Sequence, residues 1–445
     1  MTAADRLLPA LIATLFACIW LFVVVDLLGP GLLPPKLGAT MLALLMIAAL
    51  VRASGHIRIL AFALGLGASV LIWLTHDDES LWRGLSAALP FAAFLPTVVA
   101  LRAAVELTPA IAGIRASVSE LPAEGRIAWM TLGAHLLAAI ITLGFVSVLR
   151  PMLPERLTPD ARLDLARGGI RGLGLAVAWS PFFVASAAAA QLVPSVPFWR
   201  TVLIGLSIAL IGMLIAHRLF TPSLSRAQLR DAIGRVRVLL APTVLLVGAV
   251  VAISALTGWT SLQSIVVAVP LASAAYIVLR AGSAARHTGA RIVAGAGRMG
   301  DEVIIMTASV VFGTMVAGHG LPGSVEHAIE ALGRFPSIII ALQVTTMVGL
   351  GFAGLHPIVS ASVLVPLTQS LDLPIAPQVL ANMVTLAWAL SSMISIWTLP
   401  VVVTSNLFEI PVRHLATGAN LRFALLVGTA GVAWLSLLNG WMASP

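Results

Sequence analysis

The sequence predicts an all-α polytopic membrane protein with about 11–12 transmembrane helices, arranged in two repeats that each carry a proline-broken re-entrant hairpin. The first observation is composition: 59% of the 445 residues are hydrophobic and 10% are charged, against about 25% charged residues in average soluble proteins. The second is the recurrence of apolar stretches of about 20 residues, the length that crosses a bilayer. The third is a pair of apolar stretches interrupted by proline and glycine.

The apolar stretches follow one another with only loop-sized polar segments between them, so no soluble domain is expected. Runs of this length exclude an outer-membrane barrel, whose strands alternate polar and apolar residues. Lys36 is the only lysine beside many arginines, a usage typical of GC-rich bacteria. We therefore expect a multi-pass protein of the bacterial inner (cytoplasmic) membrane. The expected spans are 8–28, 38–52, 58–75, 86–104, 127–149, 198–219, 237–257, 262–280, 300–318, 336–353, 376–400 and 421–441.

Two segments, 168–197 and 349–374, are apolar but rich in Gly, Pro, Ser and Ala. A central proline removes a backbone donor and kinks or ends a helix. At membrane depth this is tolerated only where the freed groups face protein or a water-filled cavity. Both segments are therefore predicted to be broken or re-entrant helices, and 398–411 is predicted to be a further broken segment.

The two broken segments resemble each other, which indicates an internal duplication. Residues 181–186 (PFFVAS) align with residues 357–362 (PIVSAS) at an offset of 176, and the same offset takes Met130-Thr131 to Met306-Thr307. The predicted organisation has two N-terminal spans in 1–57, a first repeat in 58–219, a basic linker in 220–236, a second repeat in 237–411 and a C-terminal span in 412–445.

The placement of arginines predicts the orientation of the repeats. The loops 218–237 and 280–298 are arginine-rich and two spans apart, so both are expected on the cytoplasmic side. In the first repeat, placing the basic cluster at 150–171 inside makes the repeats antiparallel, whereas placing Arg52 and Arg58 inside makes them parallel. We prefer the antiparallel arrangement, because broken helices in two inverted halves form the midplane site of many secondary transporters.

Several classes of protein are excluded by what the sequence lacks. It has no H-E-x-x-H motif, no G-x-S-x-G motif and no P-loop lysine, so an enzyme is not expected. Cys18 is the only cysteine, which excludes a disulfide framework and a multi-cysteine metal site. Nucleic-acid binding is not expected without a soluble basic domain. No cofactor is expected beyond Na⁺ or H⁺ as a coupling ion.

The duplicated broken segments are the predicted substrate-binding site. The free N–H groups at the start of a half-helix form a small site for anions, and the hydroxyls of Ser180, Ser186, Ser360 and Ser362 are candidates to complete it. The alternative is that these small residues only allow helices to pack closely.

His356 and Trp179 flank the two prolines. An ionisable group at membrane depth indicates function, and a histidine there can couple a proton to binding or neutralise an anion. The alternative for His356 is a neutral, hydrogen-bonded structural histidine. Trp179 is a candidate wall of the binding pocket, with packing or interface anchoring as its alternative.

Thr404, Ser405 and Asn406 form a polar cluster in the segment 398–411. Unwound backbone and side-chain oxygens coordinate Na⁺ or substrate in transporters. We therefore interpret Thr404 and Ser405, with His356, as ion-coupling candidates and Asn406 as a substrate ligand. An ordinary helix end explains the cluster equally well.

The stretches 354–362 (GLHPIVSAS) and 404–408 (TSNLF), within two repeats that span 58–411, resemble the ion-transporter superfamily of secondary carriers. That superfamily includes divalent-anion symporters and the large membrane subunits of TRAP transporters. The resemblance implies a homodimer with a fixed scaffold and a moving transport domain that carries the two hairpins.

Three functions remain open on the sequence alone. The first is a secondary active transporter of a small anionic solute, with binding at 179–186 and 356–362. The second is a lipid-phosphate or glycolipid translocase, in which Arg171 or Arg413 flanks a lateral opening. The third is a membrane assembly partner that transports nothing.

Overall fold

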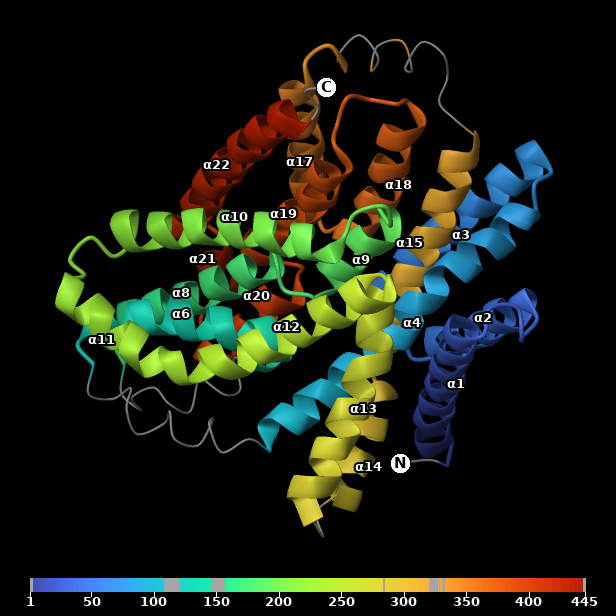
Figure 1. Ribbon diagram of the computed structural model, residues 1–445, viewed down its shortest axis with the longest axis horizontal. Helices are drawn as coiled ribbons and strands as arrows, with labels where there is room; N and C mark the ends of the chain where they lie inside the picture. The colour runs from blue at the N-terminus through green and yellow to red at the C-terminus, as the bar shows by residue number, and fades with distance from the viewer. Residues whose placement is uncertain are drawn as a thin grey trace. The chain divides into compact units, whose positions relative to one another are not determined.

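The computed structural model describes residues 3–107, 121–145, 157–282, 285–319, 327, 329 and 333–442, and every regular element in these ranges is helical. Labels follow Figure 1. The α-helices are α1 Ala3–Leu28, α2 Pro35–Leu50, α3 Gly55–Thr75, α4 Glu79–Glu106, α6 Ala123–Ile141, α8 Pro159–Val177, α9 Val184–Leu192, α10 Phe198–Leu219, α11 Arg226–Val236, α12 Leu240–Thr257, α13 Ser261–Ala281, α14 Ala285–Ala296, α15 Gly300–His319, α17 Pro336–Phe352, α18 Pro357–Ser370, α19 Pro377–Ile394, α20 Leu399–Phe408, α21 Val412–Ala416 and α22 Ala419–Met442. Two short 3₁₀ turns are η1 Thr142–Gly144 and η3 Arg237–Leu239.

The predicted fold class is confirmed: the chain is an all-α polytopic membrane protein. Within the ranges given above, nine helical segments are long and apolar enough to cross a bilayer, and two shorter apolar helices, Lys36–Leu50 and Pro336–Phe352, accompany them. The span expected at 376–400 is interrupted, because α19 ends at Ile394 and α20 begins at Leu399. The span expected at 127–149 is helical as α6 up to Ile141; residues 146–149, like Arg150 and Arg156, lie outside the described residues.

Internal contacts divide the chain into two compact units. Unit 1 comprises residues 1–107, 259–331 and 358–373, and unit 2 comprises residues 108–258, 332–357 and 374–445. The first predicted repeat has 58–107 in unit 1 and 108–219 in unit 2, whereas the second has 259–331 and 358–373 in unit 1 and its remaining residues in unit 2. The repeat boundaries themselves stay a prediction.

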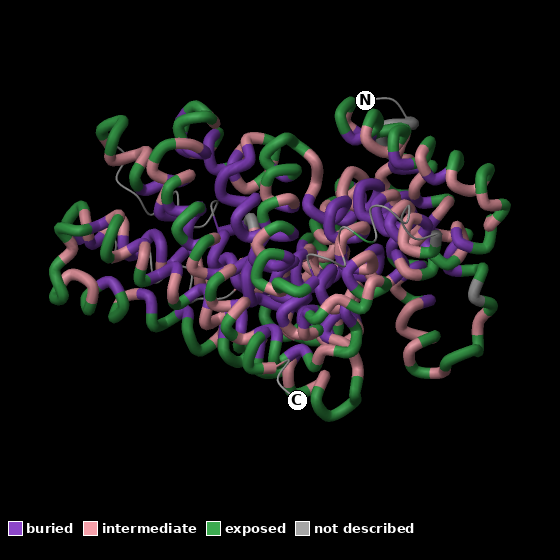
Figure 2. The backbone as a smooth tube through the Cα atoms, turned by 90° about the horizontal axis from the view of Figure 1, so that it is seen from above, coloured by how far each residue is buried: buried purple, intermediate pink, exposed green. Residues whose placement is uncertain are grey.

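Unit 1 is built around α4, which contacts α1, α2, α13, α14 and α15. Close approach is possible because small residues face the neighbouring backbones: a Cβ on Gly84 of α4 would lie 2.8 Å from the Cα of Val311 on α15. The indole N–H of Trp20 donates to the Val266 carbonyl at 2.8 Å, which ties α1 to α13. In Figure 2 the colour of many helices changes between buried and exposed within each turn, because one face packs inward and the other faces outward.

Unit 2 is built around α8, which lies beside α6 (Figure 1) and also contacts α10, α19, α20 and α21. Every residue of α8 from Gly168 to Val177 is buried. Glycines allow this: a Cβ on Gly172 would overlap the Thr131 carbonyl of α6, and one on Gly174 would overlap the Met393 side chain of α19. Helix α8, the first part of the broken segment 168–197, therefore lies at the centre of unit 2.

Candidate functional site

The first break separates α8, which ends at Val177, from α9, which begins at Val184. Ser180 lies at its centre and is fully buried. Its hydroxyl donates to the Ala139 carbonyl of α6 at 2.5 Å and accepts the Phe182 backbone N–H at 3.3 Å. The Ser186 hydroxyl donates to the Ser180 carbonyl at 2.6 Å. Both predicted serines therefore satisfy backbone groups that the break leaves free, as a break away from water requires.

A second break with the same hydrogen-bond pattern lies between α19 and α20. The Trp397 backbone N–H donates to the Ser395 hydroxyl at 3.3 Å, and the Thr398 hydroxyl donates to the Ser395 carbonyl at 2.8 Å. Ser395 thus corresponds to Ser180 in both roles: its hydroxyl accepts the N–H two residues later, and its carbonyl accepts a later hydroxyl. Sequence reasoning missed Ser395. The nearest following proline, Pro400, lies five residues after Ser395, so no adjacent proline marked it.

The two broken helices pack against each other. Helix α8 contacts α19 and α20, and α9 contacts α19. Along α8, Arg162 pairs with Glu409 at 2.9 Å, whereas Gly174 faces Met393. Arg167 also donates to the His414 carbonyl at 2.9 Å, so α8 meets the end of α20, α21 and α19 along its length. Both breaks therefore lie near one crossing inside unit 2.

Trp179 is anchored from α6. Its indole N–H donates to His135 Nε2 at 3.2 Å, and His135 Nδ1 is 3.3 Å from the Gly172 carbonyl oxygen. An indole N–H can only donate, so Nε2 is the accepting nitrogen and Nδ1 carries the hydrogen that bonds the carbonyl. His135 is therefore neutral in this arrangement and joins α6, α8 and the first break.

His356 and the serines after it are divided between the two units. His356 belongs to unit 2, where its ring meets the Trp388 ring of α19 edge-on, with 5.2 Å between centroids. Ser360 and Ser362 are buried in α18, which belongs to unit 1 from Ile358 onward. The Ser362 hydroxyl bonds the Ile358 carbonyl of its own helix at 2.7 Å. These two serines therefore belong to a different unit from the first break.

The polar cluster on α20 is only partly available for binding. The Ser405 hydroxyl donates to the Ile410 carbonyl, and Asn406 is exposed. Thr404 is fully buried, and its hydroxyl has no hydrogen-bond partner among the residues that the structure describes. Of the three predicted residues, only Thr404 has a buried side chain that makes no hydrogen bond within the described residues and is available to bind a ligand.

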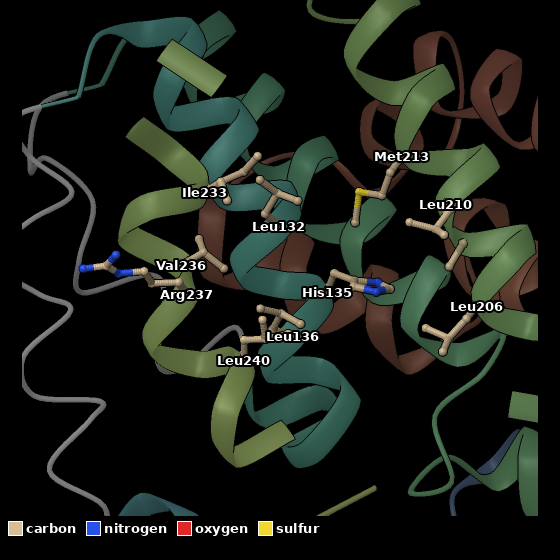
Figure 3. Close-up of a pocket in the computed structure, with 11 residues that line it drawn as sticks. Leu132, His135, Leu136, Leu206, Leu210, Met213, Ile233, Val236, Arg237 and Leu240 are labelled. Atoms are coloured by element: carbon tan, nitrogen blue, oxygen red, sulfur yellow. The ribbon is translucent and has the colours of Figure 1, made fainter. Parts of the chain in front are cut away.

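A cavity of about 220 Å³ opens beside the first break, between α6, α10, α11 and α12. Figure 3 shows His135 among Leu206, Leu210 and Met213, while the guanidinium of Arg237 points away from the other lining side chains. The remaining lining residues are apolar. This cavity suits a hydrocarbon better than an ion. Within the described ranges, no group of three or more His, Cys, Asp or Glu side chains is placed to hold a metal ion.

Comparison with known proteins gives only distant similarity. No protein-family model matches the chain, and no curated protein matches it. Among solved structures, the YdaH transporter of Alcanivorax borkumensis is similar with a TM-score of 0.49 and 13% identity over 86% of this chain and 99% of that one. MtrF of Neisseria gonorrhoeae, described with a class of antimetabolite efflux pumps, is similar with a TM-score of 0.47 and 14% identity over 94% and 97%. Both TM-scores are too low to assign a fold family, so the function is argued from the site.

Proposed function

We propose that the protein is a secondary active transporter of a small anionic organic solute, coupled to H⁺ or Na⁺ and working by an elevator-like form of alternating access. We place it in the bacterial inner membrane as a homodimer. The observation that carries the proposal is the pair of broken helices packed against each other in unit 2, with similar hydrogen bonds at Ser180 and at Ser395.

The breaks are difficult to explain as packing alone. Each one removes backbone hydrogen bonds where water is scarce and needs dedicated hydroxyls to replace them. Half-helix ends carry partial charges, and in transporters these ends bind the substrate and the coupling ion at the midplane. The Thr404 hydroxyl, which has no hydrogen-bond partner among the described residues and is close in sequence to the second break, supports a binding role.

The test is charge movement in reconstituted proteoliposomes on a solid-supported membrane. Carboxylates, sulfonates and phosphates are added one class at a time, with and without a Na⁺ gradient and at pH 6 and pH 8. We expect a current from one anion class that depends on Na⁺ or on pH. No current from any anion under any gradient, with protein shown to be folded and inserted, would contradict the proposal.

A lipid-phosphate translocase is the second candidate, and the apolar cavity beside His135 favours it, because such a cavity accepts a hydrocarbon chain. It is tested in the same vesicles with a fluorescent prenyl-phosphate lipid whose outer-leaflet fraction is quenched by dithionite. Faster loss of protected lipid than in protein-free vesicles would support it. Failure of both assays would leave the membrane assembly partner as the remaining function.

A further inference from the structure

Arg171 is a buried arginine at the centre of unit 2. It lies on α8, is 5% exposed and donates from Nε to the Asn420 side-chain oxygen at 2.9 Å. Its guanidinium carbon lies 4.4 Å from the ring centroid of Phe220 and 5.2 Å from that of Phe423. The aromatic faces and one neutral amide hold the side chain but do not neutralise it.

The surroundings of Arg171 add positive charge. Arg167 and Arg422 lie close enough to repel it, and Asp164 is the acid near enough to attract it. Asp164 Oδ1, however, is 3.8 Å from Arg167 Nη1. Among the described residues, no carboxylate forms an ion pair with Arg171. A buried charge of this kind is costly unless a counter-charge accompanies it.

The local backbone also favours a negative charge. Asn420 is the second residue of α22, a 24-residue helix whose N-terminus carries partial positive charge. Asn420 Nδ2 donates to the Met393 carbonyl at 3.3 Å, in the last turn of α19 before the second break. In the described part of the chain, the terminal Nη nitrogens of Arg171 make no hydrogen bond.

We propose that Arg171 binds an oxyanion, a carboxylate or a phosphate, at the N-terminus of α22. The oxyanion supplies the missing negative charge and accepts hydrogen bonds from the free Nη nitrogens. The planar guanidinium matches the two oxygens of such a group. This inference rests on the proposed function insofar as the oxyanion belongs to the transported solute; an anionic lipid headgroup offers the same chemistry.

The experiment is the melting temperature of the purified full-length protein in a non-ionic detergent, at constant ionic strength maintained with chloride. The probes are acetate, succinate, inorganic phosphate and the lipid phosphatidic acid, each titrated separately. The variant Arg171→Met is compared with Arg230→Met, an exposed arginine of α11. We expect at least one probe to raise the melting temperature of the wild type and of Arg230→Met, and its half-saturation concentration to increase at least about tenfold in Arg171→Met.

A second variant covers the case in which Arg171→Met does not fold. Asn420→Asp places a carboxylate against the guanidinium, so the protein carries its own counter-charge. We expect this variant to fold and to lose the response to the probe. A response to soluble anions indicates a solute, and a response to phosphatidic acid alone indicates a lipid headgroup.

The proposal is overturned if no probe stabilises the wild type, or if both Arg171→Met and Asn420→Asp respond as the wild type does. Anion binding in detergent does not require transport, so the two proposals fail separately. If a solute drives current but the anion-induced rise in melting temperature does not depend on Arg171, only the Arg171 proposal is contradicted. If the anion-induced rise in melting temperature depends on Arg171 but no current is seen, only the proposed transporter function is contradicted.

Discussion

The hydroxyl of Ser180 makes two hydrogen bonds at once, donating to Ala139 of α6 and accepting from Phe182 within the break. Replacing it with alanine leaves a buried carbonyl and a buried N–H without their partner. We therefore expect Ser180→Ala to destabilise the protein by about 1–3 kcal/mol, seen as a lower melting temperature in detergent. Ser69→Ala is the control, because that exposed hydroxyl bonds only the carbonyl of Gly65 in its own helix. Equal melting temperatures for the two variants would show that the break does not depend on Ser180.

Thr404 presents the opposite case, because its buried hydroxyl has no partner among the described residues. Valine has the same shape without the hydroxyl. We expect Thr404→Val to keep or raise the melting temperature while weakening the apparent affinity for the transported anion about threefold to tenfold, the loss of one hydrogen bond. Thr14→Val, on an exposed part of α1, is the matched control for transport. Unchanged affinity in Thr404→Val would remove this residue from the binding site.

Within α8, glycine determines how closely α6 approaches. A Cβ on Gly172 would overlap the Thr131 carbonyl, which is backbone and cannot move alone. We expect Gly172→Ala to cost about 1–3 kcal/mol through forced separation of the two helices. In contrast, a Cβ on Gly234 of α11 meets nothing within 4 Å, so Gly234→Ala should stabilise by about 0.5–1 kcal/mol. Melting temperatures of the two variants should thus move in opposite directions; a shift in the same direction would contradict the packing of α6 on α8.

The elements divide into those that a sequence can specify locally and those that it cannot. Apolar runs such as 198–219 coincide with the helix α10, because length and hydropathy are local properties. The break at Ser180 was anticipated because Pro181 follows it directly. The break at Ser395 was missed, because its nearest following proline is Pro400 and the span expected at 376–400 continued through it.

The hydrogen-bond partners of the predicted site residues could not be predicted either, because they lie far away along the chain. Ser180 bonds a carbonyl 41 positions away, and Arg171 bonds a residue 249 positions away. Such pairs depend on which helices pack together, and no periodicity within one segment specifies that. Arg171 was visible in the sequence as a cation near a break, but its burial and the absence of a described carboxylate partner required the structure.

Across the whole chain, both predicted repeats contribute residues to both units, and the duplication stays a prediction. Residues 58–107 and 259–331 lie in unit 1, whereas 108–219, 332–357 and 374–411 lie in unit 2. The second repeat also has 237–258 in unit 2 and 358–373 in unit 1, so the two repeats are not divided at matching positions. In the sequence, the segment that aligns with α8–α9 is 349–374, which contains most of α18, and two such segments in inverted halves are expected to run antiparallel. The orientation of the repeats in the membrane then becomes a measurable consequence.

Inverted repeats require the start of α8 to face the same side as the two arginine-rich loops of the second half. We expect single cysteines at Asp160, Ser223 and His287, all exposed, to react with a membrane-impermeant maleimide in inverted inner-membrane vesicles and not in intact spheroplasts. The background is Cys18→Ser, which removes the chain's one cysteine. The expectation follows from the excess of arginine that marks cytoplasmic loops. Labelling of Asp160→Cys from the outside, with the other two inside, would show that the repeats are parallel. The two broken helices would then need another explanation than inverted symmetry.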